Sequence, residues 1–226
     1  MALHRLKALA VGVVATLILS WPGPVPASDR DGPALPFRAE PLRVDSINKR
    51  VLIYAEVNPE SLNQSNPHWG VVFQGGKLNN KAIFQAFCTP QAFHDALLQI
   101  GARPGNNLTL RSSGEVIAGD ELLVSVTGPG LSRPLALADV LEDSSGKGFR
   151  IRFGGNRQRA LEEQTGCITC LESCPIGITS NAAHPAISSF KRLLSPNSQF
   201  KLRSGKNFRQ GGLVLIYSLA IRESLL

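Results

Sequence analysis

Apolar and polar residues alternate along several short stretches of the chain, which is the pattern of half-buried β-strands. In the stretch 149–153, arginines alternate strictly with large apolar residues. The stretch 213–221 is almost continuously apolar, which favours a strand that is buried on both faces. The predicted strands lie at 42–44, 51–57, 68–73, 81–87, 108–110, 121–127, 149–153 and 213–221.

Residues 90–100 carry the clearest helical pattern of the chain. Thr89 suits the N-cap, Pro90 suits the first helical position, and Gly101 suits the left-handed residue that ends a helix. The apolar residues of this segment form one stripe, and His94 faces away from it, so we expect its ring to be solvated. A second, short helix is predicted over 190–194.

These elements predict an α+β fold dominated by one sheet. The strands outnumber the helices and follow one another mostly without helical crossovers, so the sheet is expected to be mostly antiparallel. We expect one helix, near 90–100, and a loop or short helix that carries the cysteines of the segment 165–181. No internal repeat or boundary divides residues 41–226, which are therefore predicted to form a single domain.

The amino terminus has the pattern of an export signal. Arg5 and Lys7 precede an apolar run of about a dozen residues, too short to span a bilayer comfortably, and small residues at Val25 and Ala27 suit cleavage after Ala27. We therefore expect residues 1–27 to be a signal peptide, 28–40 to be a mobile leader, and the protein to be periplasmic or secreted. An uncleaved membrane anchor is the alternative, whereas the mature chain carries no further apolar run of membrane-spanning length.

Composition and charge exclude several classes of protein. Hydrophobic residues make up 43% of the 226 residues and charged residues 18%, which excludes a disordered chain and a solvated coiled coil. Removal of the signal reduces the formal charge from +7 to +5, and the remaining basic residues are dispersed, so no nucleic-acid partner is expected. Neither a nucleophile elbow nor a phosphate-binding loop is present, and an enzyme is less expected than a binding or carrier protein.

Three of the four cysteines lie within eight residues. Cys167, Cys170 and Cys174 are spaced C-x2-C-x3-C and are followed by Pro175. Soft ligands this close in sequence suit an iron–sulfur cluster or a zinc ion. The spacing also matches the end of the bacterial ferredoxin pattern, from which one cysteine is missing. The three thiols are therefore the candidate ligands of a metal or cofactor.

The surroundings of these cysteines resemble a known family. The segments 153–156 and 165–181, together with 93–105 and 119–121, are similar to the YdjY family of exported, ferredoxin-like proteins. This resemblance covers roughly residues 45–220. It implies a [4Fe–4S] cluster bound by the three cysteines, and an electron carrier or accessory subunit that works with a redox protein partner.

The fourth ligand and the redox state of the thiols stay open at this point. A [4Fe–4S] cluster and a zinc site each require four ligands, for which Cys88 is the remaining thiol and His184 the nearest histidine downstream. A chain exported unfolded carries no assembled cluster, and thiols outside the cytoplasm tend to oxidise. The alternatives are a dithiol that exchanges electrons, or a non-catalytic extracytoplasmic binding module whose cysteines form disulfides.

Overall fold

The computed structural model describes residues 40–62, 66, 68–129, 131–186, 200–203 and 212–220. The predicted signal peptide, the predicted leader up to residue 39 and the predicted helix at 190–194 lie outside this part of the chain. Within it, no helix is both long and apolar enough to cross a membrane.

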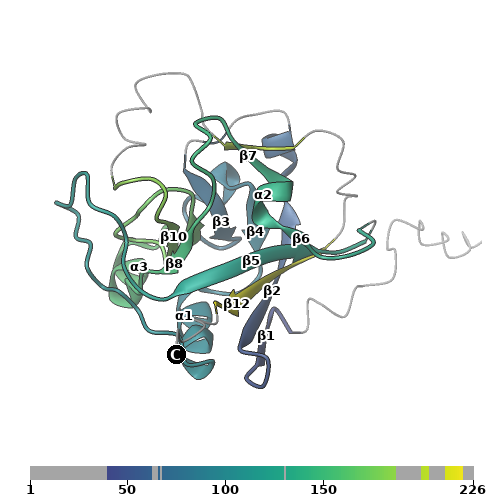
Figure 1. Cartoon of the computed structure of the whole chain (residues 1–226), viewed down its shortest axis with the longest axis horizontal. Helices are drawn as coiled ribbons and strands as arrows, with labels where there is room; N and C mark the ends of the chain where they lie inside the picture. The colour runs from purple at the N-terminus through teal and green to yellow at the C-terminus, as the bar shows by residue number, and fades with distance from the viewer. Residues whose placement is uncertain are drawn as a thin grey trace, which may run out of the picture. The chain divides into compact units, whose positions relative to one another are not determined.

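The main sheet closes on itself, with eight strands in a ring (Figure 1). β2 pairs through its first half with β1 and through its second half with β4, so the ring ends where it begins. In order around the ring, the strands are β2 (Arg50–Val57), β12 (Leu213–Leu219), β5 (Glu121–Thr127), β8 (Ile151–Phe153), β10 (Thr179–Asn181), β9 (Cys167–Cys170), β3 (Trp69–Phe73) and β4 (Phe84–Ala86).

The smaller elements lie outside this ring. β1 (Leu42–Asp45) and β6 (Leu135–Ala136) pair with β2 and β5, and β7 (Leu141–Asp143) pairs with β11 (Phe200–Leu202) in a separate two-stranded sheet. The helices are α1 (Pro90–Gln99), α2 (Leu137–Val140) and α3 (Arg157–Glu163), with 3-10 turns at Pro59–Leu62 and Asn79–Lys81.

The predicted α+β class is wrong, because the described part of the chain is mainly β and its helices are few and short. The sequence prediction missed the closure, which depends on pairing between strands far apart in the chain, such as β2 with β12. Most pairings are antiparallel, while β9–β10 and β3–β4 are parallel. The cysteine segment is also different from the expected loop or short helix, since Cys167–Cys170 forms strand β9. The stretch 108–110 forms no strand.

The core follows the two-residue period of the strands. In β12, Leu213, Leu215 and Tyr217 are buried while the residues between them are partly exposed, and Val51, Ile53 and Ala55 of β2 are fully buried. One continuous apolar cluster contains these side chains together with those of β5, β8 and α1. Burial of this apolar surface is the main force that holds the closed sheet together.

The helix expected over 90–100 is present as α1, and Thr89 and Gly101 lie at its two ends as the sequence predicted. The Thr89 hydroxyl accepts a hydrogen bond from the Ala92 N–H at 3.2 Å, and Gly101 has a φ of +86°, which favours glycine. The Phe93 ring packs edge-on against Tyr217, with centroids 4.7 Å apart. His94 is buried rather than solvated, because its ring lies against Phe153.

We predict that two adjacent leucines of α1 differ sharply in their contribution to stability. Leu97 is fully buried and Leu98 is 46% exposed. Leu97→Ala should lower the free energy of unfolding by about 2–5 kcal/mol, because it leaves a cavity in the core. Leu98→Ala should change it by less than about 0.5 kcal/mol. Urea denaturation followed by circular dichroism measures both, and equal losses for the two variants would contradict this packing.

Candidate metal centre

The position of the cysteines depends on strand β9, which lies between β10 and β3. Cys170 is the register partner of Trp69 on β3 and of Ser180 on β10. The pairing with β3 is irregular near Val71, and it continues beyond the strand as a hydrogen bond from the Leu171 N–H to the His68 carbonyl oxygen at 2.7 Å. The residue that precedes β3 is therefore held beside the cysteine segment.

Three cysteines and one histidine gather at this point. One nitrogen of the His68 ring and the sulfurs of Cys170 and Cys174 all lie within 4.8 Å of one another. Cys167 lies in the same buried cluster as these two cysteines, beside the three ligand atoms that converge. We call these four side chains the Cys3His group. Three thiols and an imidazole are the ligands that a single soft or borderline metal ion prefers.

Hydrogen bonds to the backbone hold the segment between β9 and β10 in place. The Asn156 side-chain amide donates to the carbonyl oxygens of Cys174 and Gly177, at 3.1 and 2.9 Å. The Arg159 guanidinium donates to the Pro175 carbonyl oxygen at 2.8 Å. A Cβ atom on Gly177 would lie only 2.7 Å from the Cys170 sulfur, so this position requires glycine. The segment has little freedom to move its sulfurs.

The thiols are buried and electrostatically coupled. The single S–H of Cys170 can donate to either Cys167 or Cys174 and lowers the pKa of each, while the Cys174 charge opposes ionisation of Cys167. The N–H groups of Ile176 and Gly177 also point at the Cys174 sulfur, at 3.4 and 3.5 Å. Cys170 has a raised pKa, because donating these bonds requires its proton and burial penalises its thiolate. The group therefore stabilises thiolates at Cys167 and Cys174.

The buried carboxylate of Glu172 lies close to the His68 ring. Glu172 is fully buried, and its Oε2 atom lies 3.7 Å from His68 Nδ1. Burial by itself would lower the pKa of His68, but its interactions with the Cys174 thiolate and the Glu172 carboxylate outweigh burial and raise the pKa to about 10. A metal-binding histidine usually has a carboxylate, a carbonyl group or a water molecule as the partner of its other ring nitrogen. Glu172 is a carboxylate of this kind close to the His68 ring.

The two other residues considered from the sequence lie elsewhere. Cys88 is buried in the main apolar core, whereas the three clustered cysteines belong to a separate cluster with Val72 and Ala82. The His184 ring is fully buried and hydrogen-bonds through Nε2 to Asp143 at 2.9 Å. All four cysteines are free thiols in this structure. The fold thus brings His68, rather than Cys88 or His184, to the three cysteines.

The sequence analysis overlooked His68 and Glu172, although each had a weak signal. His68 directly precedes a predicted strand, and Glu172 lies between two of the cysteines. Neither residue belongs to a spaced pattern such as H-x-x-x-H, so only the pairing of β3 with β9 reveals their role.

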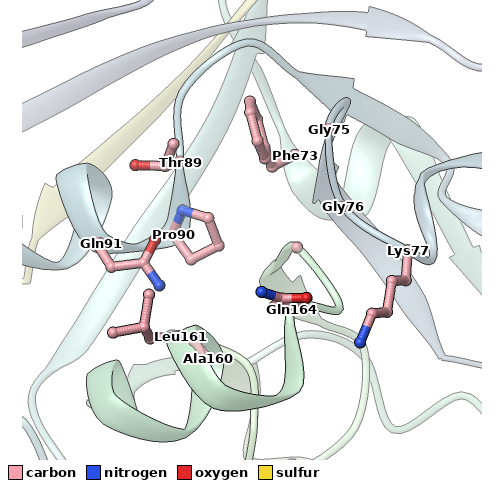
Figure 2. A pocket seen from close by; sticks show the side chains of 11 residues that line it. Phe73, Gly75, Gly76, Lys77, Thr89, Pro90, Gln91, Ala160, Leu161 and Gln164 are labelled. Carbon is pink, nitrogen blue, oxygen red and sulfur yellow. The ribbon is translucent and has the colours of Figure 1, made fainter.

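A pocket of about 330 Å³ is lined by residues from the start of α1, the end of α3 and the turn after β3 (Figure 2). The pocket is bordered by Thr89, Pro90 and Gln91 at the start of α1, by Gln164, and by Gly166, which precedes Cys167. Its lining contains no His, Cys, Asp or Glu, and so it offers no further metal-ligating side chain to the Cys3His group.

Comparison with known proteins identifies relatives of this chain. The model of the YdjY domain matches residues 42–209. A curated relative, named "Uncharacterized protein YdjY", from Escherichia coli (strain K12), is 39% identical over 147 residues. The chain spans 65% of the length of that relative, and the match covers 65% of this chain. The search of solved structures found no match.

We predict that Cys88 and Cys174 differ in reactivity in the folded, reduced and chelator-treated protein. Burial raises the pKa of Cys88 to about 12, so at pH 8 only about one molecule in ten thousand carries its thiolate. The lowered pKa of Cys174 favours its thiolate at the same pH. Iodoacetamide should therefore modify Cys174 well before Cys88, as measured by mass spectrometry of timed digests. In denaturant both should react alike, and equal rates in the folded protein would contradict this assignment.

Proposed function

The chain belongs to the YdjY domain family, and we propose that it is an exported metal-centre protein whose Cys3His group holds a single metal ion. The observation that carries the proposal is the convergence of the His68 ring with the Cys170 and Cys174 sulfurs, within 4.8 Å of one another. Cys167, in the same buried cluster as Cys170 and Cys174, would supply the fourth donor. Four soft or borderline ligands complete a tetrahedral site.

The close spacing of the donors supports one ion rather than a [4Fe–4S] cluster. Around a tetrahedral Zn²⁺ ion, bond lengths near 2.3 Å place two sulfur ligands about 3.8 Å apart. A cluster binds each thiolate through a different iron atom, and so it holds its ligands further apart. Here the Cys170 and Cys174 sulfurs lie within 4.8 Å of each other, and Gly177 packs directly on Cys170. These residues fit a single ion and do not fit the four-iron cluster that the family resemblance implied.

Burial of the ligands favours an accessory or carrier role over catalysis. Cys167, Cys170 and Cys174 are 3%, 0% and 6% exposed, and the protein itself supplies all four ligands. Catalytic zinc sites keep one position for water or substrate, whereas closed sites of this kind stabilise a fold or carry the ion. We therefore expect Zn²⁺ and an accessory function. Bound iron in the same ligands would favour electron transfer.

Export and metal binding are consistent with each other in this proposal. The pattern of residues 1–27 indicates export to the periplasm or the medium. Neighbouring thiols in such a compartment would oxidise to disulfides unless a ligand such as a metal ion occupies their sulfurs. A single ion can enter after the exported chain has folded, and it would protect all three sulfurs.

The test is metal analysis of the mature protein, purified after export without added metal. We expect about one Zn²⁺ per chain, no acid-labile sulfide, and three thiols that become reactive only with a chelator. Cys170→Ser should lose the ion because it removes the central donor. Cys88→Ala is the matched control and should keep the ion.

Two outcomes would contradict the proposal. Iron together with sulfide would indicate a cluster. No metal and no free thiols among the three clustered cysteines would indicate the disulfide-bonded binding module instead.

A further inference from the structure

His68 differs from the other three ligands of the proposed centre in origin and exposure. The cysteines come from one eight-residue segment, while His68 precedes β3, about a hundred residues earlier in the chain. The His68 side chain is 15% exposed and is therefore the most accessible of the four. Resting on the proposed function, we infer that His68 is the exchangeable ligand of the centre, through whose position the ion passes to an incoming sulfur donor.

The three cysteines form the part of the site that stays in place during exchange. Asn156 and Arg159 hold the carbonyl groups of their segment, and Gly177 packs against the Cys170 sulfur. Release of a sulfur would require this buried segment to move as a whole. Release of the imidazole requires a rotation of the His68 side chain away from its contacts, while the backbone of His68 remains bonded to Leu171.

Glu172 is the positioning residue for this ligand. Its carboxylate is fully buried and lies 3.7 Å from His68 Nδ1, so it sets the orientation of the ring while a ring nitrogen faces the sulfurs. A carboxylate behind a ligating histidine typically contributes 10–100-fold in metal affinity. Loss of this contact should make the imidazole leave more often.

The surroundings of His68 indicate the class of the incoming ligand. The Trp69 ring stands edge-on to the His68 ring, with centroids 5.9 Å apart, and Lys81 Nζ lies 5.2 Å above the Trp69 ring. Lys81 lies on the far side of the Trp69 contact, and its positive charge favours the approach of an anionic donor over the Trp69 ring. During exchange the imidazole–metal bond would break first and a bond to an incoming thiolate would form. Further donors of the acceptor would then replace the three cysteine–metal bonds, with no change in oxidation state. The partner implied is a protein or small molecule that presents a thiolate.

The test is the rate at which the zinc-loaded mature protein transfers its ion to the chelator 4-(2-pyridylazo)resorcinol, followed by absorbance. His68→Cys replaces the neutral, exposed ligand by a fourth thiolate and should slow transfer at least about tenfold. Glu172→Gln keeps the shape of the side chain but weakens its contact with His68, and should speed transfer about tenfold or more. Glu162→Gln, on the exposed face of α3, is the matched control and should leave the rate unchanged.

A second variant keeps the inference testable if His68→Cys does not fold. His68→Ala should bind Zn²⁺ through three cysteines, release it faster than the wild type, and recover slower release when free imidazole is added. Equal transfer rates for zinc-loaded wild type and His68→Cys, or no rescue of His68→Ala by imidazole, would overturn the inference alone. A wild-type chain that binds no zinc would overturn the proposed function, and with it this inference.

Discussion

The pairing of β3 with β9 is the constraint on which the site depends. This antiparallel pairing places Trp69 opposite Cys170 and continues as the hydrogen bond between Leu171 and the His68 carbonyl group. His68 and the cysteines are about a hundred residues apart in the sequence, and this pairing brings them together. The closed sheet stabilises the pairing from both sides, because β4 pairs with β3 and β10 pairs with β9. The geometry of the site is thus a consequence of the closure of the sheet.

Strand β9 contributes to two sets of buried side chains, a set of hydroxyl groups and the Cys3His group, and the two sets have different roles. Thr169, which lies between two of the cysteines, hydrogen-bonds to Thr179 and to the Tyr217 hydroxyl at 2.8 and 2.7 Å. These hydroxyl groups are satisfied by one another and connect β9 with β10 and β12. The Cys3His group instead consists of buried thiols, and desolvation makes buried thiolates costly. A bound cation would offset this cost, which is a physical reason for the group to hold an ion.

Metal binding and stability are expected to be coupled in this protein. Ligands from β9, from the segment that follows it and from the residue before β3 meet at one point. An ion that binds the folded chain and not the unfolded chain stabilises the fold by mass action. The coupling would act at the pairing of β3 with β9, which is irregular near Val71. A centre at this position therefore supports an irregular part of the ring.

Local patterns in the sequence determined the elements, and long-range contacts determined how they assemble. The alternation in 121–127 and 213–219 and the capping residues Thr89 and Gly101 are properties of neighbouring residues, so the corresponding strands and α1 could be predicted. The closure of the sheet could not, because pairing between β2 and β12 leaves no periodic trace in either strand. That is why an α+β class was expected where the fold is mainly β.

The same division holds for the candidate site. By itself, the sequence determined that Cys167, Cys170 and Cys174 form a set, since donors within eight residues can reach one small volume wherever the segment lies. Only the tertiary structure decided the fourth member, bringing in His68 with Glu172 behind it and leaving Cys88 in the core. The physical reason is that a ligand from a distant strand is selected by sheet register, and register is set by the burial and pairing of the whole ring.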